Sequence, residues 1–195
     1  MSRLRIVFMG TPEFAVPFLK LLLTEKYELL AVVTQPDRPR GRGKKCGCSP
    51  VKEMATSNNI RLLQPVSVKE PDFIRELAGL NADVFVVVAF GQILPPNLLA
   101  IPGLGCLNVH ASLLPRYRGA APINWVLING ETMSGITTMF MDRGMDTGNI
   151  ILQAQLPIGP NDSAGDLHDK LKILGAETLA ATLDLVSAPK ILSLS

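Results

Sequence analysis

Apolar runs along the chain alternate with stretches of helical periodicity, and turn residues separate the two. The runs at 4–9, 28–33, 82–89 and 103–110 predict strands. The run at 82–89 is apolar on both faces and rich in β-branched residues, which is typical of a central strand in a parallel sheet. Amphipathic patterns predict helices over 14–24, 71–80, 121–128 and from about 162 to 186. This alternation indicates an α/β fold.

Weaker patterns fill the remaining segments. A short helix is predicted after Ser49, a brief strand at 61–64, and further strands at 134–141 and 149–158, the first of which departs from the parallel pattern. Ser49 is a candidate N-cap, Thr11 a candidate N-cap for the first helix, and Ser163 has capping-box spacing to Asp166. The single tryptophan, Trp125, is predicted to belong to the core.

The strand that ends at His110 carries the strongest candidate chemistry. Side chains alternate along a strand, so Asn108 and His110 point to the same side. A loop rich in proline and glycine follows, at the strand end where open α/β sheets place their sites. A polar strand face in contact with solvent is the alternative interpretation of this pair.

Two other loops follow predicted strands. The segment 142–148 holds two aspartates, Asp142 and Asp146, framed by glycines that permit unusual backbone angles. The segment 90–96 carries apolar residues at the end of the central strand. It is either a hydrophobic plug or one wall of a pocket for a flat apolar ligand.

Composition narrows the class of protein. The chain has 195 residues, of which 47% are hydrophobic and 18% charged, as expected for a folded domain. No apolar run is long enough to cross a bilayer or to form a signal-peptide core, so no membrane association and a cytoplasmic location are expected. The three cysteines lack the second ligand pair of a zinc site, and no metal is expected. The first strand is not followed by Gly-x-Gly-x-x-Gly, which argues against a dinucleotide.

Positive charge is concentrated although the net charge is only +2. Five cations lie within eight residues, interleaved with proline and glycine: Arg38, Arg40, Arg42, Lys44 and Lys45. The spacing excludes a helix and predicts a mobile loop that presents cations to an anionic partner such as phosphate. A solvated loop without a partner is the alternative.

The motif Asn108-x-His110-x-Ser112-Leu113-Leu114-Pro115-x-Tyr117-Arg118-Gly119-x-x-Pro122, with the later Met145-Asp146-x-Gly148, resembles the folate-dependent formyltransferases. Segments 8–17 and 34–45 resemble the members that act on initiator tRNA. The matches run from about residue 4 to 186. The resemblance implies a three-layer α/β/α domain with a mostly parallel, Rossmann-like sheet over 1–188, followed by a short tail at 189–195. The family also carries a C-terminal β-barrel domain, and this chain is expected to depart from the family by lacking it.

The reaction implied by the resemblance moves a formyl group from 10-formyltetrahydrofolate to an amine, here the α-amino group of methionine on initiator tRNA. The tetrahedral species carries an oxyanion and an ammonium, so the site needs hydrogen-bond donors and a proton route. Asn108 is expected to donate to the oxyanion, His110 to donate or relay a proton, and Asp146 to orient the imidazole. A monomer is expected.

The resemblance also implies binding residues. The folate site would be lined by Ser112, Leu113, Leu114 and Pro115, with Phe90, Ile93 and Leu94 packing the pterin. Arg42 would contact the tRNA, and Phe14 would help receive the methionine side chain.

Other functions share the same residues. Formyl transfer to a small amine, such as glycinamide ribonucleotide or an amino sugar nucleotide, and hydrolysis of the formyl donor would both use Asn108, His110 and Asp146. A noncatalytic module that retains folate or RNA is a hypothesis of another class. The match at 10–17 and the basic segment favour tRNA as the acceptor.

Overall fold

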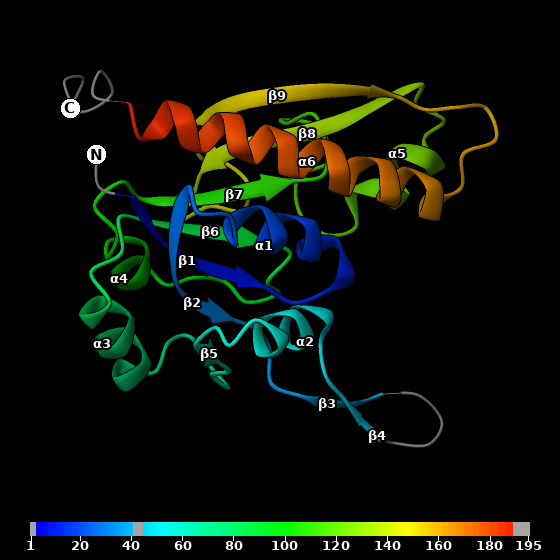
Figure 1. Ribbon diagram of the computed structural model, residues 1–195. Helices are drawn as coiled ribbons and strands as arrows, with labels where there is room; N and C mark the ends of the chain where they lie inside the picture. Colours follow the sequence, from blue (N-terminus) through cyan, green and yellow to red (C-terminus); the bar gives the residue numbers. More distant parts are fainter. Residues whose placement is uncertain (1–2, 41–44, 189–195) are drawn as a thin grey trace. The chain divides into compact units, whose positions relative to one another are not determined.

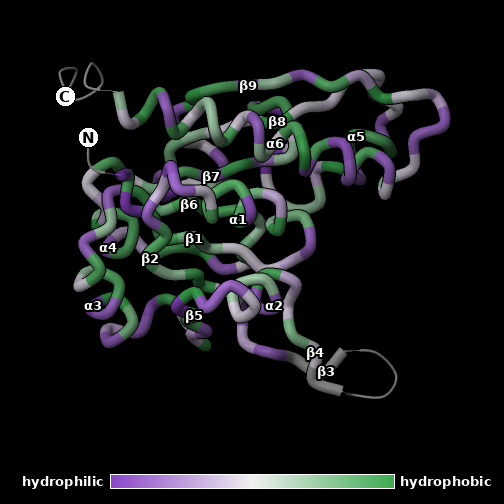
Figure 2. The backbone as a smooth tube through the Cα atoms, viewed as in Figure 1, coloured by the Kyte–Doolittle hydropathy of each residue, from purple (hydrophilic) through white to green (hydrophobic). Residues whose placement is uncertain are grey.

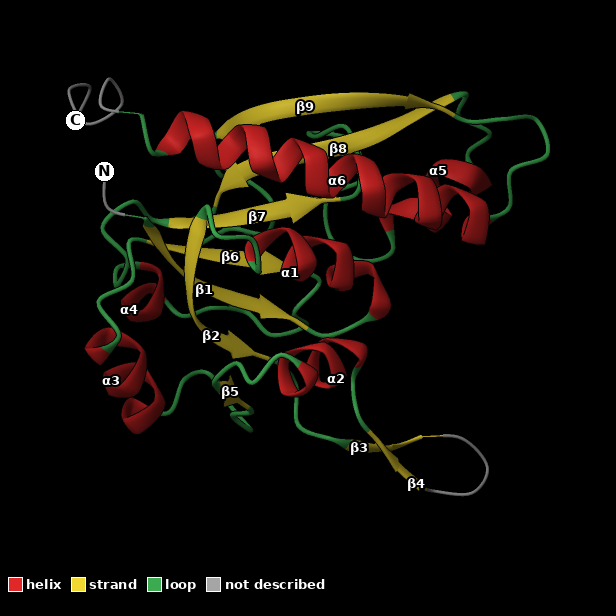
Figure 3. Ribbon diagram, viewed as in Figure 1, coloured by secondary structure: helices red, strands yellow, loops and turns green. Residues whose placement is uncertain are grey.

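The computed structural model describes residues 3–40 and 45–188, and the chain divides into two compact units, Met1–Cys106 and Leu107–Ser195 (Figure 1). Figure 3 shows helices and strands in both units, so the predicted α/β class is confirmed. None of the described helices is long and apolar enough to cross a membrane.

Four parallel strands form the sheet of the first unit, in the order β5-β2-β1-β6. They are β1 (Leu4–Gly10), β2 (Tyr27–Val33), β5 (Leu62–Leu63) and β6 (Val84–Val88). Every residue of β6 is buried, as its apolar, β-branched sequence predicts. Figure 2 shows the same strand in hydrophobic colours.

Helices and one 3₁₀ turn connect these strands: η1 (Glu13–Ala15), α1 (Val16–Leu22), α2 (Pro50–Ser57), α3 (Pro71–Gly79) and α4 (Pro96–Leu99). The Ser49 hydroxyl accepts a hydrogen bond from the Lys52 amide at 3.1 Å, which confirms Ser49 as the N-cap of α2. The prediction for Thr11 is wrong, because Pro12 takes the N-cap position of η1. The Thr11 hydroxyl instead donates to the Phe90 carbonyl at 3.1 Å.

The basic segment contains two short paired strands where the sequence predicted a loop. Strands β3 (Arg38–Arg40) and β4 (Lys45–Gly47) pair antiparallel, with Arg38 opposite Gly47. Glycine and proline exclude a helix here, but three residues on each side are enough for a short ladder, and the prediction was wrong in this respect. Arg42 lies outside the described residues.

Antiparallel strands make up the second unit: β7 (Cys106–His110), β8 (Met133–Phe140) and β9 (Ile150–Pro157). The predicted departure from the parallel pattern at β8 is therefore confirmed. The long helix α6 (Ala164–Val186) packs along β8 and β9 (Figure 1). Its N-terminus has the predicted capping box between Ser163 and Asp166.

One core prediction fails in this unit. Helix α5 (Pro122–Ile128) buries Val126, whereas Trp125 is 52% exposed. The helix has only seven residues, so one apolar side is covered and the indole lies on the other side.

Candidate active site

Strand β7 brings Asn108 and His110 to the same carboxylate. Their strand neighbours Leu107 and Val109 are buried in the core, as alternation requires. Asn108 Nδ2 donates to Asp146 Oδ1 at 3.4 Å, and His110 Nδ1 lies 3.6 Å from Asp146 Oδ2. The imidazole is only 7% exposed. The three side chains named in the sequence analysis as catalytic candidates are thus side by side in the structure.

Asp146 is held in place by its own loop. Its backbone is left-handed, with φ +54°, and its Oδ2 accepts a hydrogen bond from the Gly119 amide at 2.7 Å. A Cβ atom at Gly148 would lie 1.7 Å from the Phe140 carbonyl oxygen, so only glycine fits there. The Asp142 carboxylate accepts from the Thr147 hydroxyl at 2.7 Å and closes the loop.

The shortest contact of the His110 ring is with the main chain of Tyr117. The ring nitrogen Nε2 lies 2.8 Å from the Tyr117 carbonyl oxygen. Tyr117 has φ +59°, also left-handed. Sequence reasoning missed this contact because it uses a backbone atom, and any residue type supplies a carbonyl.

The arrangement places two hydrogen-bonding side chains around one carboxylate. A carboxylate only accepts, so the Asn108 amide nitrogen faces Asp146 with one hydrogen and keeps a second one for another acceptor. His110 is a second donor or a proton carrier beside it.

The loop after β7 is fixed by hydrogen bonds to β8 and β9. The Ser112 hydroxyl is fully buried and donates to the Arg116 carbonyl at 2.7 Å. The Leu114 amide donates to Thr137 Oγ1 at 3.1 Å, and Gln153 Nε2 donates to the Leu114 carbonyl at 2.8 Å. Of the residues assigned to folate here, Ser112 and Leu114 are buried, Leu113 is half-buried and Pro115 is exposed.

The first unit holds the other assigned residues. Phe90 and Leu94 are buried, whereas Ile93 is 72% exposed. Phe14 is buried and packs against Phe18, with ring centroids 5.5 Å apart. The ligand roles of these four residues stay predictions.

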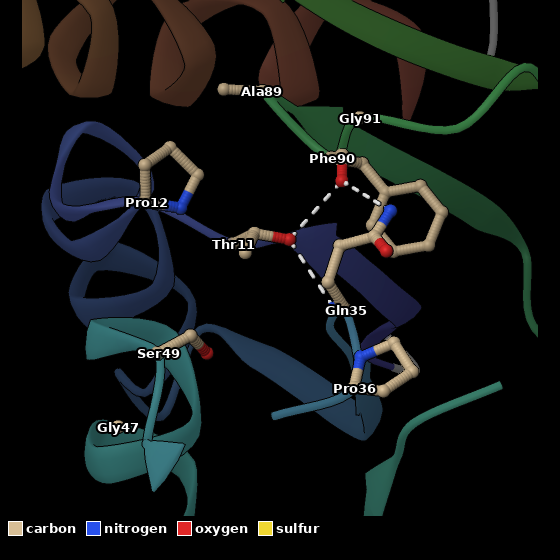
Figure 4. A pocket seen from close by; sticks show the side chains of 9 residues that line it. All are labelled: Thr11, Pro12, Gln35, Pro36, Gly47, Ser49, Ala89, Phe90 and Gly91. Carbon is tan, nitrogen blue, oxygen red and sulfur yellow. Dashed lines mark hydrogen bonds between the residues drawn. The ribbon is translucent and has the colours of Figure 1, made fainter. Parts of the chain in front are cut away.

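A cavity of about 350 Å³ opens in the first unit, where β1, β2 and β6 end (Figure 4). Thr11 and Gln35 meet over the Phe90 carbonyl, which accepts from Thr11 Oγ1 at 3.1 Å and from Gln35 Nε2 at 3.2 Å. The carboxyl ends of parallel strands are where open α/β sheets bind ligands. The cavity is lined by Thr11, Pro12, Gln35, Pro36, Gly47, Ser49, Ala89, Phe90 and Gly91.

The basic segment follows β2 as the sequence predicted. Phe90 and Gly91, from the segment at 90–96 that was predicted to be either a plug or a pocket wall, line the cavity. Pro36 lines it just before the hairpin starts, and Gly47 and Ser49 line it where the hairpin returns. Asp37 fixes the base of the hairpin by pairing with Lys52 and accepting from Gln64 Nε2 at 3.1 Å. The Lys52 ammonium beside it holds the pKa of the Asp37 carboxyl below its ordinary value.

The profile of the Formyl transferase family matches residues 4–183, and the chain belongs to this family. Among curated relatives, the methionyl-tRNA formyltransferase of Clostridioides difficile is 60% identical over 183 residues, which cover 94% of this chain and 59% of the relative. That of Geobacter sulfurreducens is 58% identical over 191 residues, covering 98% of this chain and 60% of the relative. The chain therefore spans about three fifths of the length of these relatives.

Solved structures show the same fold at lower identity. The phosphoribosylglycinamide formyltransferase from Bacillus halodurans superimposes with a TM-score of 0.80 at 22% identity, covering 98% of this chain and 100% of that one. A formyltetrahydrofolate deformylase from Pseudomonas syringae gives 0.73 at 23% identity, covering 94% of this chain and 62% of that one. The α/β fold of the chain is thus that of known formyltransferase structures.

Proposed function

We propose that the chain transfers the formyl group of 10-formyltetrahydrofolate to the α-amino group of methionine on initiator methionyl-tRNA, for translation initiation in the cytoplasm. The observation that carries the proposal is the convergence of Asn108 and His110 on Asp146, at 3.4 and 3.6 Å. The names of relatives at 60% and 58% identity support methionyl-tRNA as the acceptor.

The chemistry of the site follows from these groups. The neutral amine attacks the formyl carbon, and a C–N bond forms while the carbonyl oxygen becomes an oxyanion. Asn108 donates its second amide hydrogen to that oxygen. His110 carries the proton lost by the amine toward the folate nitrogen, whose bond to the formyl carbon then breaks. Asp146 stabilises the imidazolium while the proton is on the ring.

Folate binding is assigned to the residues predicted from the motif. Pro115 and Ile93 are exposed and offer apolar contacts. Phe90 and Leu94 are buried in the first unit and Leu114 is buried in the second, and their contribution to the pterin site stays a prediction. The Ser112 hydroxyl already bonds to Arg116, so Ser112 would act through its main chain, and Leu113 is half-buried beside it.

Binding of the tRNA is assigned to the basic hairpin of the first unit. The hairpin begins and ends at the rim of the cavity, which has Thr11 and Gln35 as polar lining groups. Arg42 and its neighbouring cations would contact phosphate or base. Phe14, which lies close in sequence to the lining residue Pro12, would support the methionine side chain.

The test mixes the chain with 10-formyltetrahydrofolate and one of three additions: initiator methionyl-tRNA, phosphoribosylglycinamide, or no amine. Tetrahydrofolate release and formylmethionine are measured together. Release that requires methionyl-tRNA supports the proposal. Release with phosphoribosylglycinamide would support formyl transfer to a small amine instead. Release without any amine would support hydrolysis of the formyl donor. Folate binding without release would support a noncatalytic module.

A salt titration tests the role of the hairpin. If phosphate contacts dominate, tRNA affinity between about 50 and 200 mM salt falls by an order of magnitude or more. An affinity that hardly changes over this range contradicts a role of the cations at 38–45 in tRNA binding.

A further inference from the structure

The hydrogen bond between His110 and Tyr117 determines which ring nitrogen carries the proton. A backbone carbonyl has no hydrogen to give, so Nε2 must be the donor in the 2.8 Å contact with the Tyr117 oxygen. In the neutral ring the lone pair is then on Nδ1, the nitrogen 3.6 Å from Asp146. The carbonyl of Tyr117 therefore directs proton exchange to the side of the ring that faces the carboxylate.

Holding this carbonyl in place needs an external restraint. Tyr117 has φ +59°, a backbone region that bulky residues rarely adopt, and its peptide would relax if nothing held it. The residue lies in a loop rich in proline and glycine, between β7 and α5. The restraint must come from its side chain or from its neighbours.

The side chain of Tyr117 supplies that restraint. Its hydroxyl donates to Glu131 Oε1 at 2.6 Å and accepts from Asn129 Nδ2 at 3.2 Å. Arg116 pairs with the same carboxylate, with Nη1 at 3.1 Å from Oε2, and its guanidinium lies 5.3 Å from the centre of the Tyr117 ring. The Tyr117 hydroxyl and the Arg116 guanidinium both hold the pKa of Glu131 below its ordinary value, so the anchor keeps its charge.

We propose that Tyr117 is a positioning residue for His110, and that Glu131 is its anchor. The anchor fixes the Tyr117 peptide, the peptide fixes the Nε2–H tautomer, and Nδ1 is left as the nitrogen that exchanges protons. The consequence for catalysis rests on the proposed formyl transfer, whereas the consequence for the tautomer does not depend on it.

The tautomer is read by nitrogen NMR of the full chain at about pH 8.5, where an ordinary imidazole is neutral. The chain has two histidines, so a His168→Asn variant assigns the signals. Tyr117→Phe removes the hydroxyl, and Glu131→Ala removes the acceptor. Glu131→Gln keeps a neutral acceptor of the same shape. Glu76→Ala, which breaks a surface ion pair with Arg61 in the first unit, is the matched control.

The parent chain and Glu76→Ala are expected to show the Nε2–H form of His110. Tyr117→Phe and Glu131→Ala are expected to show a mixture of tautomers and kcat lower by about tenfold, with KM for the formyl donor within about twofold of the parent. Glu131→Gln should retain most of the Nε2–H form and most of the parental kcat. A folded Tyr117→Phe or Glu131→Ala chain that keeps the parent tautomer overturns the proposal, whatever its activity. If the variants lose the Nε2–H form but the parent chain transfers no formyl group, only the proposed function is contradicted.

Discussion

Asn108 Nδ2 lies 3.4 Å from Asp146 Oδ1, so the amide assigned to the oxyanion also holds the carboxylate beside the imidazole. The two residues come from β7 and from the loop after β8, 38 positions apart. One side chain thus links strand β7 to the loop that carries Asp146. Its loss should affect both the donor and the position of its partner.

Asn108→Ala is therefore expected to lower kcat about 100- to 1000-fold, the usual cost of one oxyanion donor. Asn108 is half-buried, and the smaller side chain leaves the strand ladder intact, so the thermal midpoint should change little. Steady-state kinetics and thermal unfolding check this together. Asn124→Ala, an exposed amide on α5, is the control and should retain parental activity. Near-parental activity of Asn108→Ala would remove Asn108 from the catalytic groups.

Gly148→Ala tests the loop that carries Asp146. The added Cβ would lie 1.7 Å from the Phe140 carbonyl oxygen, which is backbone and has no room to move aside. We expect a destabilisation of about 1–3 kcal/mol in urea unfolding, together with reduced activity, because Asp146 is two residues away.

The control for that variant is Gly79→Ala, at the end of α3, where a Cβ meets nothing within 4 Å. It should be neutral or slightly stabilising, because alanine favours a helix over glycine by about 1 kcal/mol. Equal stability of the two alanine variants would show that the loop accommodates a side chain at position 148.

Cys106 should resist alkylation in the folded chain. Burial raises the pKa of its thiol to about 12, so at about pH 8 only on the order of one molecule in ten thousand carries the thiolate there. Cys48 is exposed. Brief treatment with iodoacetamide followed by peptide mass spectrometry should label Cys48 and spare Cys106 until denaturant is added. Equal labelling of both in the native chain would contradict the burial of β7.

The Asp162 carboxylate stabilises the folded chain by an amount that depends on pH. The Lys170 ammonium and the Gly159 amide hold the pKa of its carboxyl below its ordinary value of 3.8. The folded state thus binds the proton less readily than the unfolded chain, and the stabilisation is complete above about pH 5. It is lost as pH falls through the folded-state pKa. Unfolding free energies of the parent and Asp162→Asn should differ at pH 7 and converge in acid. A constant difference would contradict this.

Most of the framework follows from local sequence patterns. The apolar run at 82–89 predicted the buried strand β6, and Ser163 with Asp166 predicted the start of α6, because burial and capping depend on residues close together in the chain. The β3–β4 hairpin was missed, since its short ladder leaves no alternation in a segment dominated by cations, proline and glycine.

The motif predicted which side chains belong to the candidate site, but not how they are held. Asn108 and His110 share a face by strand alternation, whereas the contact of His110 with the Tyr117 carbonyl depends on a backbone atom in a left-handed residue. The apolar segment at 90–96 predicted one possible wall of the cavity, but its other lining residues come from separate strand ends that no local pattern brings together. Trp125 was misplaced because a short helix gives too few positions to define its buried side.

The left-handed backbone of Asp146 has a consequence for redesign of the chain. At φ +54° glycine is the residue that fits without strain, so a search for thermal tolerance alone would replace the aspartate. The same replacement would delete the acceptor for the Gly119 amide and the anion beside His110. Under the proposed mechanism, stability and turnover therefore favour different amino acids at position 146, and a stabilised version should keep the aspartate.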